Sequence, residues 1–166
     1  MIELSGAPGV ALVRIPATGA PDGPARIAAA VRYLGGGYAI VLTGSGPAAP
    51  AEQLADAVFA IARHPRPVVA AFEGDVLGAG YALAAAAAVR VMAGGRLGLG
   101  RSFALPRPVE DLLRAHAGPH WARIRAGHTF GPEAAFAAGL VETWCAPEDL
   151  LATAIAKAAL STVQAC

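Results

Sequence analysis

The chain has 166 residues, which is enough for one sizeable core and too few for two ordinary domains. Hydrophobic residues make up 55% and charged residues 15%, and the mean hydropathy is +0.50, so the composition excludes intrinsic disorder. The net charge of +1 and the pI near 7.9 exclude the basic surface expected of a protein that binds nucleic acid or an anionic membrane.

Short apolar runs bounded by glycine and proline predict buried β-strands in the first half of the chain. Between these runs, apolar residues at helical spacing predict helices, as with Ile27, Val31 and Leu34. In chain order we expect a strand at 10–13, a helix at 25–34, a strand at 38–42, a helix at 51–62 and a strand at 68–72.

The second half continues the same alternation after a glycine-rich turn at 74–80. We expect, in order, a helix at 81–88, short strands at 89–92 and 96–99, helices at 108–117, 120–125 and 132–138, a strand at 140–144 and a helix at 147–163. Apolar strands that alternate with helices predict a parallel sheet covered by helices. We expect residues 1–166 to form one α/β domain.

Cellular context follows from a few further features. Cys145 and Cys166 are too few for a disulfide scaffold and lack the spacing of a zinc site, so we expect reduced thiols in the cytoplasm. The first residues lack the pattern of a signal peptide. The run at 76–89 has no charge, but it is too short to span a bilayer and predicts a buried helix.

The glycine-rich turn contains Gly74, Gly78 and Gly80. A strand that leads through such a turn into a helix aims backbone N–H groups at one point, where negative charge is favoured. A nucleotide-phosphate loop would need Lys-Ser or Lys-Thr after its last glycine, but Tyr81 and Ala82 follow here, and a dinucleotide fingerprint needs another glycine spacing. Another use is an oxyanion hole, in which N–H groups stabilise the negative charge that develops on a carbonyl oxygen.

Three segments together carry a resemblance to a known family. Residues 67–80 (PVVAAFEGDVLGAG) are similar to a signature that begins Pro-Val-Ile-Ala-Ala and ends Leu-Gly-Gly-Gly. Residues 127–141 (GHTFGPEAAFAAGLV) are similar to a segment with Ala-x-Glu-Ala and then Gly-Leu-Val, and residues 41–46 (VLTGSG) match an upstream strand and Thr-Gly turn. The segments occur in the right order, and the chain resembles the crotonase superfamily, the enoyl-CoA hydratases and isomerases.

The resemblance implies a fold and a site. The fold is the crotonase-like (ClpP/crotonase) superhelix of ββα units, with parallel sheets covered by helices, here truncated at the C-terminus. The oxyanion-hole donors would be the N–H groups of Ala79 and Ala51, and the substrate would lie against Gly74, Gly78 and Gly80. No metal or separate cofactor is implied, because CoA or a carrier-protein thioester is itself the ligand.

The carboxylates of the family's hydratases are missing from the matching positions. Hydration of an enoyl thioester needs one or two carboxylates to activate water and protonate the α-carbon. Ala82 and Arg101 stand where the two glutamates are expected, and Ala88 stands in place of an aspartate. Backbone amides alone do not move protons, so we expect no standard hydratase activity.

Other polar residues could supply the missing chemistry, but simpler structural roles account for each of them. These residues are Glu73 and Asp75 at the turn, Glu110 and Asp111 at a helix start, Tyr81, and the histidines His64, His116, His120 and His128.

Three functions remain open from the sequence. The first is a non-hydratase or accessory subunit that binds an acyl-CoA or acyl-carrier thioester. The second is an active decarboxylase or isomerase of the same superfamily that acts mainly through the oxyanion hole, with secondary metabolism as one setting. The third is a purely structural interaction protein. In each case we expect a homo-oligomer (a trimer or hexamer) or a hetero-oligomer with an active paralogue, and neither nucleic acid nor membrane as a partner.

Overall fold

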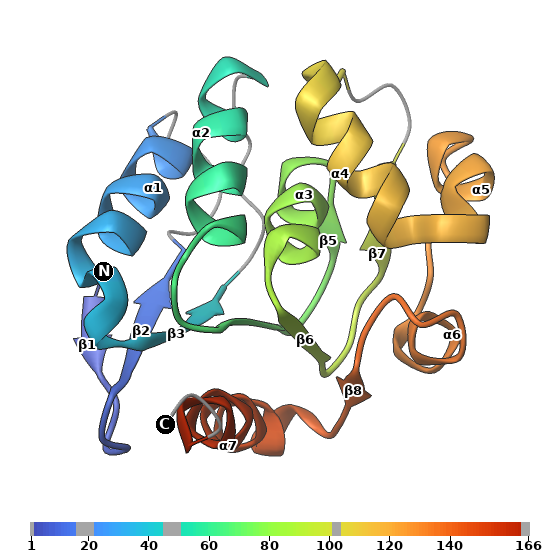
Figure 1. Cartoon of the computed structure of the whole chain (residues 1–166). Helices are drawn as coiled ribbons and strands as arrows, with labels where there is room; N and C mark the ends of the chain where they lie inside the picture. The colour runs from blue at the N-terminus through green and yellow to red at the C-terminus, as the bar shows by residue number, and fades with distance from the viewer. Residues whose placement is uncertain (1, 16–21, 45–50, 101–103, 164–166) are drawn as a thin grey trace.

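A six-stranded sheet organises the fold (Figure 1). The computed structural model describes residues 2–15, 22–44, 51–100 and 104–163. The strand order is β1-β2-β3-β4-β6-β8, and a small second sheet pairs β5 with β7. The strands are β1 (Ile2–Leu4), β2 (Val10–Arg14), β3 (Ala39–Thr43), β4 (Val68–Phe72), β5 (Val76–Leu77), β6 (Val89–Met92), β7 (Leu97–Gly98) and β8 (Thr143–Trp144).

Helices follow most of these strands along the chain. They are α1 (Gly23–Leu34), α2 (Ala51–Ala62), α3 (Ala79–Ala86), α4 (Arg107–Ala117), α5 (Trp121–Arg125), α6 (Pro132–Ala137) and α7 (Leu150–Val163). Short 3₁₀ turns occur at Gly35–Gly37, Gly118–His120 and Pro147–Asp149. Among the described residues, no helix is long and apolar enough to cross a membrane.

The central strands are apolar along their whole length because both faces of the sheet are covered. All five residues of β4 are buried, as are the first four of β2 and of β3. Strands β2, β3, β4, β6 and β8 pair in parallel, with Val41 opposite Leu12 on one side and Val69 on the other. The parallel sheet that the sequence predicts is confirmed for these strands.

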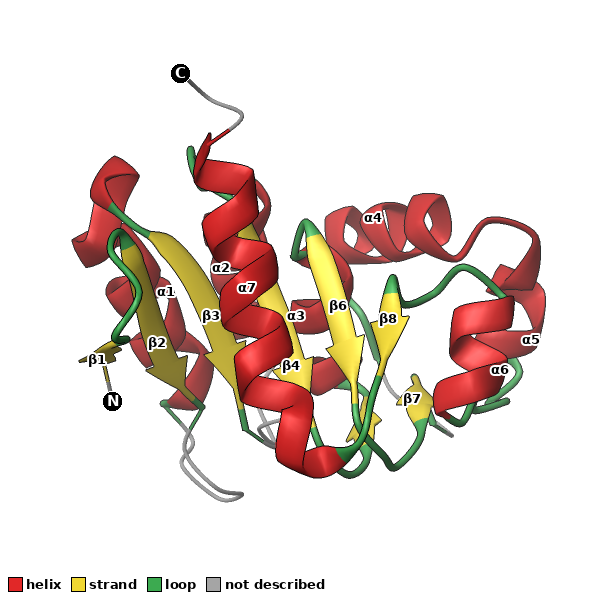
Figure 2. Ribbon diagram, turned by 90° about the horizontal axis from the view of Figure 1, so that it is seen from below, coloured by secondary structure: helices red, strands yellow, loops and turns green. Residues whose placement is uncertain are grey.

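Two hydrophobic cores lie on opposite faces of the sheet. Ile40 and Phe72 belong to the larger core under α1 to α4, whereas Val41 and Val69 face the smaller core under α7. Figures 1 and 2 show this arrangement, with α7 alone across one face of the sheet. Successive strand residues therefore alternate between the two helical layers.

Three local predictions were wrong. Strand β1, which the sequence analysis did not predict, pairs antiparallel with β2 at the sheet edge, and two residues within the expected turn at 74–80 form β5. The expected strand at 140–144 is reduced to Thr143–Trp144. Leu140 instead donates its N–H to the Ala135 carbonyl, which closes the end of α6 and draws the chain away from the sheet.

Candidate functional site

The site is built where the chain leaves β4 and enters α3. Gly74 and Gly78 both have positive φ, +88° and +56°, a region that side chains disfavour. The Gly78 N–H donates to the Gly98 carbonyl at 3.0 Å, and this hydrogen bond fixes the turn to β7. The backbone can then start α3 at Ala79 without a side-chain cap.

The first turn of α3 offers free backbone donors. The Ala82 N–H donates to the Gly78 carbonyl at 3.1 Å, which is the first hydrogen bond of α3 to a residue four positions earlier. Within the described ranges, the N–H groups of Ala79, Gly80 and Tyr81 have no acceptor. They lie at the positive end of the helix dipole, where a carbonyl oxygen that gains negative charge would be stabilised.

A narrow apolar cavity of about 20 Å³ adjoins this turn. Its walls come from the carboxyl ends of β3 and β4 and from the sheet-facing side of α3. The lining residues are all apolar or glycine: Ile15, Leu42, Gly44, Ala70, Ala71, Phe72, Val76, Gly80, Leu83 and Ala84. The described lining residues suit an aliphatic group and include no carboxylate or imidazole.

The second proposed donor, Ala51, is the first residue of α2. Helix α2 follows β3 and packs against α3. Because β3 and β4 are parallel, the helices that follow them both begin at the carboxyl edge of the sheet. Gly44, at the end of β3, lines the same cavity as Gly80, but residues 45–50 lie outside the described residues.

The positions of the missing carboxylates differ in their surroundings. Ala82 is fully buried in the larger core and does not line the cavity. Ala88 is exposed after α3, with its N–H donating to the Val68 carbonyl at 2.9 Å. Arg101 lies outside the described residues.

The remaining carboxylates near the turn are occupied or turned to solvent. Asp75 pairs with Arg96 at 2.9 Å, and this hydrogen bond lowers the pKa of Asp75. Glu73 is exposed. Neither side chain lines the cavity, which agrees with the structural roles that the sequence analysis gave them.

The acidic pair at the start of α4 is also removed from the cavity. Glu110 lies 3.5 Å from Arg114 and 3.8 Å from Arg125, so it serves a surface ion-pair network. Asp111 is exposed. Neither residue lines the cavity, and a shifted carboxylate base is therefore not found at this helix.

Three of the histidines make local contacts. Nδ1 of His64 lies 2.8 Å from the Arg66 carbonyl oxygen, so the half-buried His64 stabilises its own loop. His128 contacts the Arg123 carbonyl at 3.0 Å, and His120 packs edge-on against Phe130. Among the described residues, no cluster of His, Cys, Asp and Glu could hold a metal ion.

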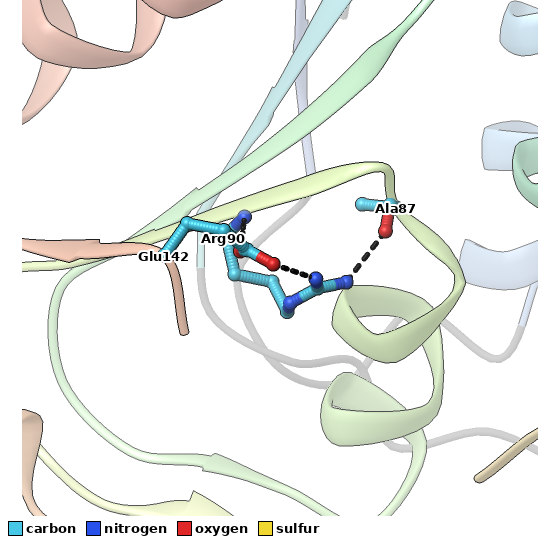
Figure 3. Close-up of polar contacts among 3 residues, drawn as sticks. All are labelled: Ala87, Arg90 and Glu142. Atoms are coloured by element: carbon cyan, nitrogen blue, oxygen red, sulfur yellow. Dashed lines mark hydrogen bonds and ion pairs between the residues drawn. The ribbon is translucent and has the colours of Figure 1, made fainter. Parts of the chain in front are cut away.

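The fourth histidine, His116, lies in a buried polar cluster that the sequence analysis missed. Its ring packs against Tyr81, with centroids 6.0 Å apart. Arg90, buried at the start of β6, pairs with Glu142 and donates to the Ala87 carbonyl at 2.6 Å (Figure 3). The available signal was a charged residue inside an otherwise apolar strand pattern, because such a residue needs a buried partner.

Burial dominates the electrostatics of this cluster. It raises the pKa of Tyr81 well above its ordinary value, against the opposing effect of Arg90. Burial and the charge of Arg90 lower the pKa of His116 to about 4, while Glu142 and the Leu140 backbone act in the opposite direction. His116 is therefore neutral in the folded protein at neutral pH.

We expect stability to fall as the pH drops from 7 to 5. The unfolded chain takes up a proton at His116 near pH 6.5, whereas the folded chain resists it down to about pH 4. Stability is therefore complete above pH 6.5 and is lost progressively below it, by on the order of 2 kcal/mol at pH 5. Urea unfolding at several pH values measures this slope.

Two variants test whether His116 causes the dependence of stability on pH. His116→Gln should flatten it, whereas His128→Gln, at an exposed position, should leave it as in the parent protein. An unchanged slope in His116→Gln would contradict the assignment.

Comparisons with known proteins agree with this architecture. No family model and no curated protein sequence matches the chain. Among solved structures, a monofunctional enoyl CoA isomerase from M. smegmatis has 25% identity and a TM-score of 0.82, over 95% of this chain and 82% of that one. A putative enoyl-CoA hydratase/isomerase family protein from Hyphomonas neptunium has 24% identity and a TM-score of 0.80, over 95% and 74%.

A third structure, an enoyl-CoA hydratase from Mycobacterium marinum, has 21% identity and a TM-score of 0.79, over 96% of this chain and 90% of that one. The second and third similarities show the fold alone. The isomerase similarity spans nearly the whole chain. The chain therefore has the fold of the crotonase superfamily, the enoyl-CoA hydratases and isomerases, and its similarity to the isomerase supports the sequence resemblance to that superfamily.

Proposed function

We propose that the protein binds an acyl thioester, from CoA or a carrier protein, with the carbonyl oxygen at the first turn of α3. The observation that carries this proposal is the set of free N–H groups in the first turn of α3, which includes that of Ala79, together with the apolar cavity that the next residue, Gly80, lines. A thioester carbonyl offers the oxygen, and its acyl chain offers the apolar group. The N–H of Ala51 at the start of α2 is the proposed second donor.

We also propose that the protein is not a hydratase and serves as a binding or accessory subunit. Hydration needs a group that activates water close to the polarised double bond. The cavity wall is apolar, and the expected glutamate position is the buried Ala82. The exposed side chains of Phe136, Trp144 and Leu160 support the further proposal that the chain assembles with copies of itself or with an active paralogue.

Decarboxylation of a malonyl-type thioester is a second candidate, which the apolar wall favours. In this reaction the bond between the α-carbon and the carboxylate breaks, and its electron pair forms the enolate as CO₂ leaves. The enolate oxygen would accept from the Ala79 N–H, and water would later protonate the α-carbon. No base is needed to start the reaction, and an apolar surrounding destabilises the departing carboxylate.

A ligand series on the melting temperature tests the proposal. A ligand that binds only the folded state adds about 2.7 kcal/mol of stability at one hundred times its Kd. For a chain of this size, that corresponds to a rise in Tm of roughly 5–10 °C. We expect butyryl-CoA at millimolar concentration to raise Tm, and its thioether analogue, in which CH₂ replaces the carbonyl, to raise it distinctly less.

The controls separate the three functions. Free CoA reports any contribution of the nucleotide part, and equal shifts with the thioester and the thioether would contradict the oxyanion role. Turnover of an enoyl-CoA to the hydroxyacyl product would contradict the non-hydratase proposal, and release of CO₂ from malonyl-CoA would favour the decarboxylase. If no ligand shifts Tm, the chain is an interaction protein, and the solution mass of the same samples shows its assembly state.

A further inference from the structure

Three buried polar atoms in one region of the core have no hydrogen-bond partner. They are Oη of Tyr81, Nε of Arg90 and Nε2 of His116, and each atom is inaccessible to solvent. The residues come from three elements, α3, β6 and α4. Among the described side chains, only one other buried polar atom, Nε2 of His64, lacks a partner. Buried polar groups are normally satisfied, so a cluster of three calls for a physical explanation.

Tyr81 and His116 pack against each other, and the charge of Arg90 is close enough to act on both. The rings of Tyr81 and His116 lie with centroids 6.0 Å apart and planes inclined by 54°. The charge of Arg90 acts on both rings and lowers the pKa of each. Tyr81 is fully buried, and Arg90 is 7% exposed.

The rest of the Arg90 side chain is already committed. Its Nη1 donates to the Ala87 carbonyl, and its Nη2 pairs with the Glu142 carboxylate, as Figure 3 shows. The carboxylate is held further by the backbone N–H of Arg90 at 2.7 Å. Of the three guanidinium nitrogens, only Nε has no hydrogen-bond partner, and its single N–H is a fixed donor.

The hydrogen-bonding character of His116 is also fixed. The Leu140 backbone hydrogen-bonds the ring, and since Nε2 has no partner, this bond uses Nδ1. A proton on Nδ1 that donates to a carbonyl leaves Nε2 with a lone pair. The cluster therefore presents one donor at Arg90, one acceptor at His116 and one hydroxyl at Tyr81.

We propose that these three atoms form a binding site for one ordered internal water molecule. The water would donate one hydrogen to Nε2 of His116 and accept hydrogen bonds from the Nε–H of Arg90 and the hydroxyl of Tyr81. Three hydrogen bonds are the usual number for a buried water. The neutral state of His116 fits this role, because a protonated ring would have no lone pair to accept the hydrogen.

The water would join three segments of chain that are far apart in sequence. Tyr81 belongs to the first turn of α3, two residues after Ala79, while Arg90 is the second residue of β6 and His116 lies in the last turn of α4. The bridged cluster would hold the helix that carries the free N–H groups against both of its neighbours. The site does not depend on whether the protein binds a thioester.

Removal of the Tyr81 hydroxyl gives results of opposite sign with and without the water. If the water is present, Tyr81→Phe removes one of its hydrogen bonds, and we expect Tm to fall by about 2–4 °C. If the hydroxyl is buried with no partner, phenylalanine removes an uncompensated polar group, and Tm stays level or rises. Tyr33→Phe, at a side chain 83% exposed, is the matched control and should leave Tm unchanged.

A crystal structure of the unaltered protein gives the second measurement. We expect a water peak within about 2.7–3.2 Å of all three atoms. A direct Tyr81–His116 hydrogen bond, or an empty space between the three atoms, would overturn the proposal. A rise in Tm of Tyr81→Phe would overturn it independently.

Discussion

Gly95→Ala should cost at least about 4 kcal/mol of unfolding free energy or prevent folding altogether. Gly95 has φ +69° and lies in the connection between β6 and β7. A Cβ there would meet the backbone of Gly74, with the carbonyl carbon at 1.9 Å and the oxygen at 2.0 Å. The neighbour is main chain and cannot rotate away, so the turn that leads to α3 must move.

Gly139→Ala separates the clash from the backbone strain. Gly139 has φ +70°, nearly the same conformation, but a Cβ there would meet nothing within 4 Å. We therefore expect this variant to lose only the left-handed penalty, about 1 kcal/mol. Urea unfolding of both variants measures the difference. Equal losses would show that the contact between Gly95 and Gly74 tolerates a side chain.

Gly95→Ala should also affect the candidate site, because Gly95 contacts the turn that leads to α3. The ion pair between Asp75 and Arg96 and the hydrogen bond from the Val76 N–H to the Arg96 carbonyl tie the two loops together next to the contact. A shift of Gly74 therefore moves the start of α3. If the variant folds, its Tm should respond less to butyryl-CoA than that of Gly139→Ala.

The sequence predicted the central sheet and its helices because their signals are local and repeated. Helix α2 and strand β4 have the predicted bounds, 51–62 and 68–72. An apolar run between glycine and proline indicates a buried strand wherever the flanking turns are clear. Strands β1 and β5 have three and two residues, too few to show a period, and they form only because a partner strand is present.

The sequence predicted the turn into α3 and missed the buried polar cluster, while the role of Ala79 as a donor stays a prediction. Gly74, Gly78 and Gly80 indicated a turn into a helix, and the structure places the free N–H of Ala79 at that point. The pairing of Arg90 with Glu142 joins residues 52 positions apart, and no local pattern encodes such a contact. Long-range polar contacts depend on the packed tertiary structure, which periodicity does not describe.

The second large effect comes from the buried ion pair between Arg90 and Glu142. We expect Glu142→Gln to lower the free energy of unfolding by about 2–3 kcal/mol. Arg90 keeps its charge, its side chain is only 8% exposed, and the amide of glutamine cannot neutralise it. The carboxylate of Glu142 is 37% exposed, so solvent screening keeps the loss below that of a fully buried pair. Denaturant unfolding at pH 7 measures the change.

Asp56→Asn is the matched control, because it removes the same charge from an ion pair at the surface. Arg32 and Asp56 have side-chain exposures of 58% and 53%, so their separation should cost far less than the loss of the buried pair. High salt should reduce that small effect and leave the cost of Glu142→Gln nearly unchanged, since buried charges are screened less.

The double variant Arg90→Met with Glu142→Gln should recover part of the loss in stability, because the penalty comes from leaving Arg90 charged and unpaired. If the double variant is as unstable as the sum of both single variants, the cost lies in lost packing around Ala87 and the end of α3.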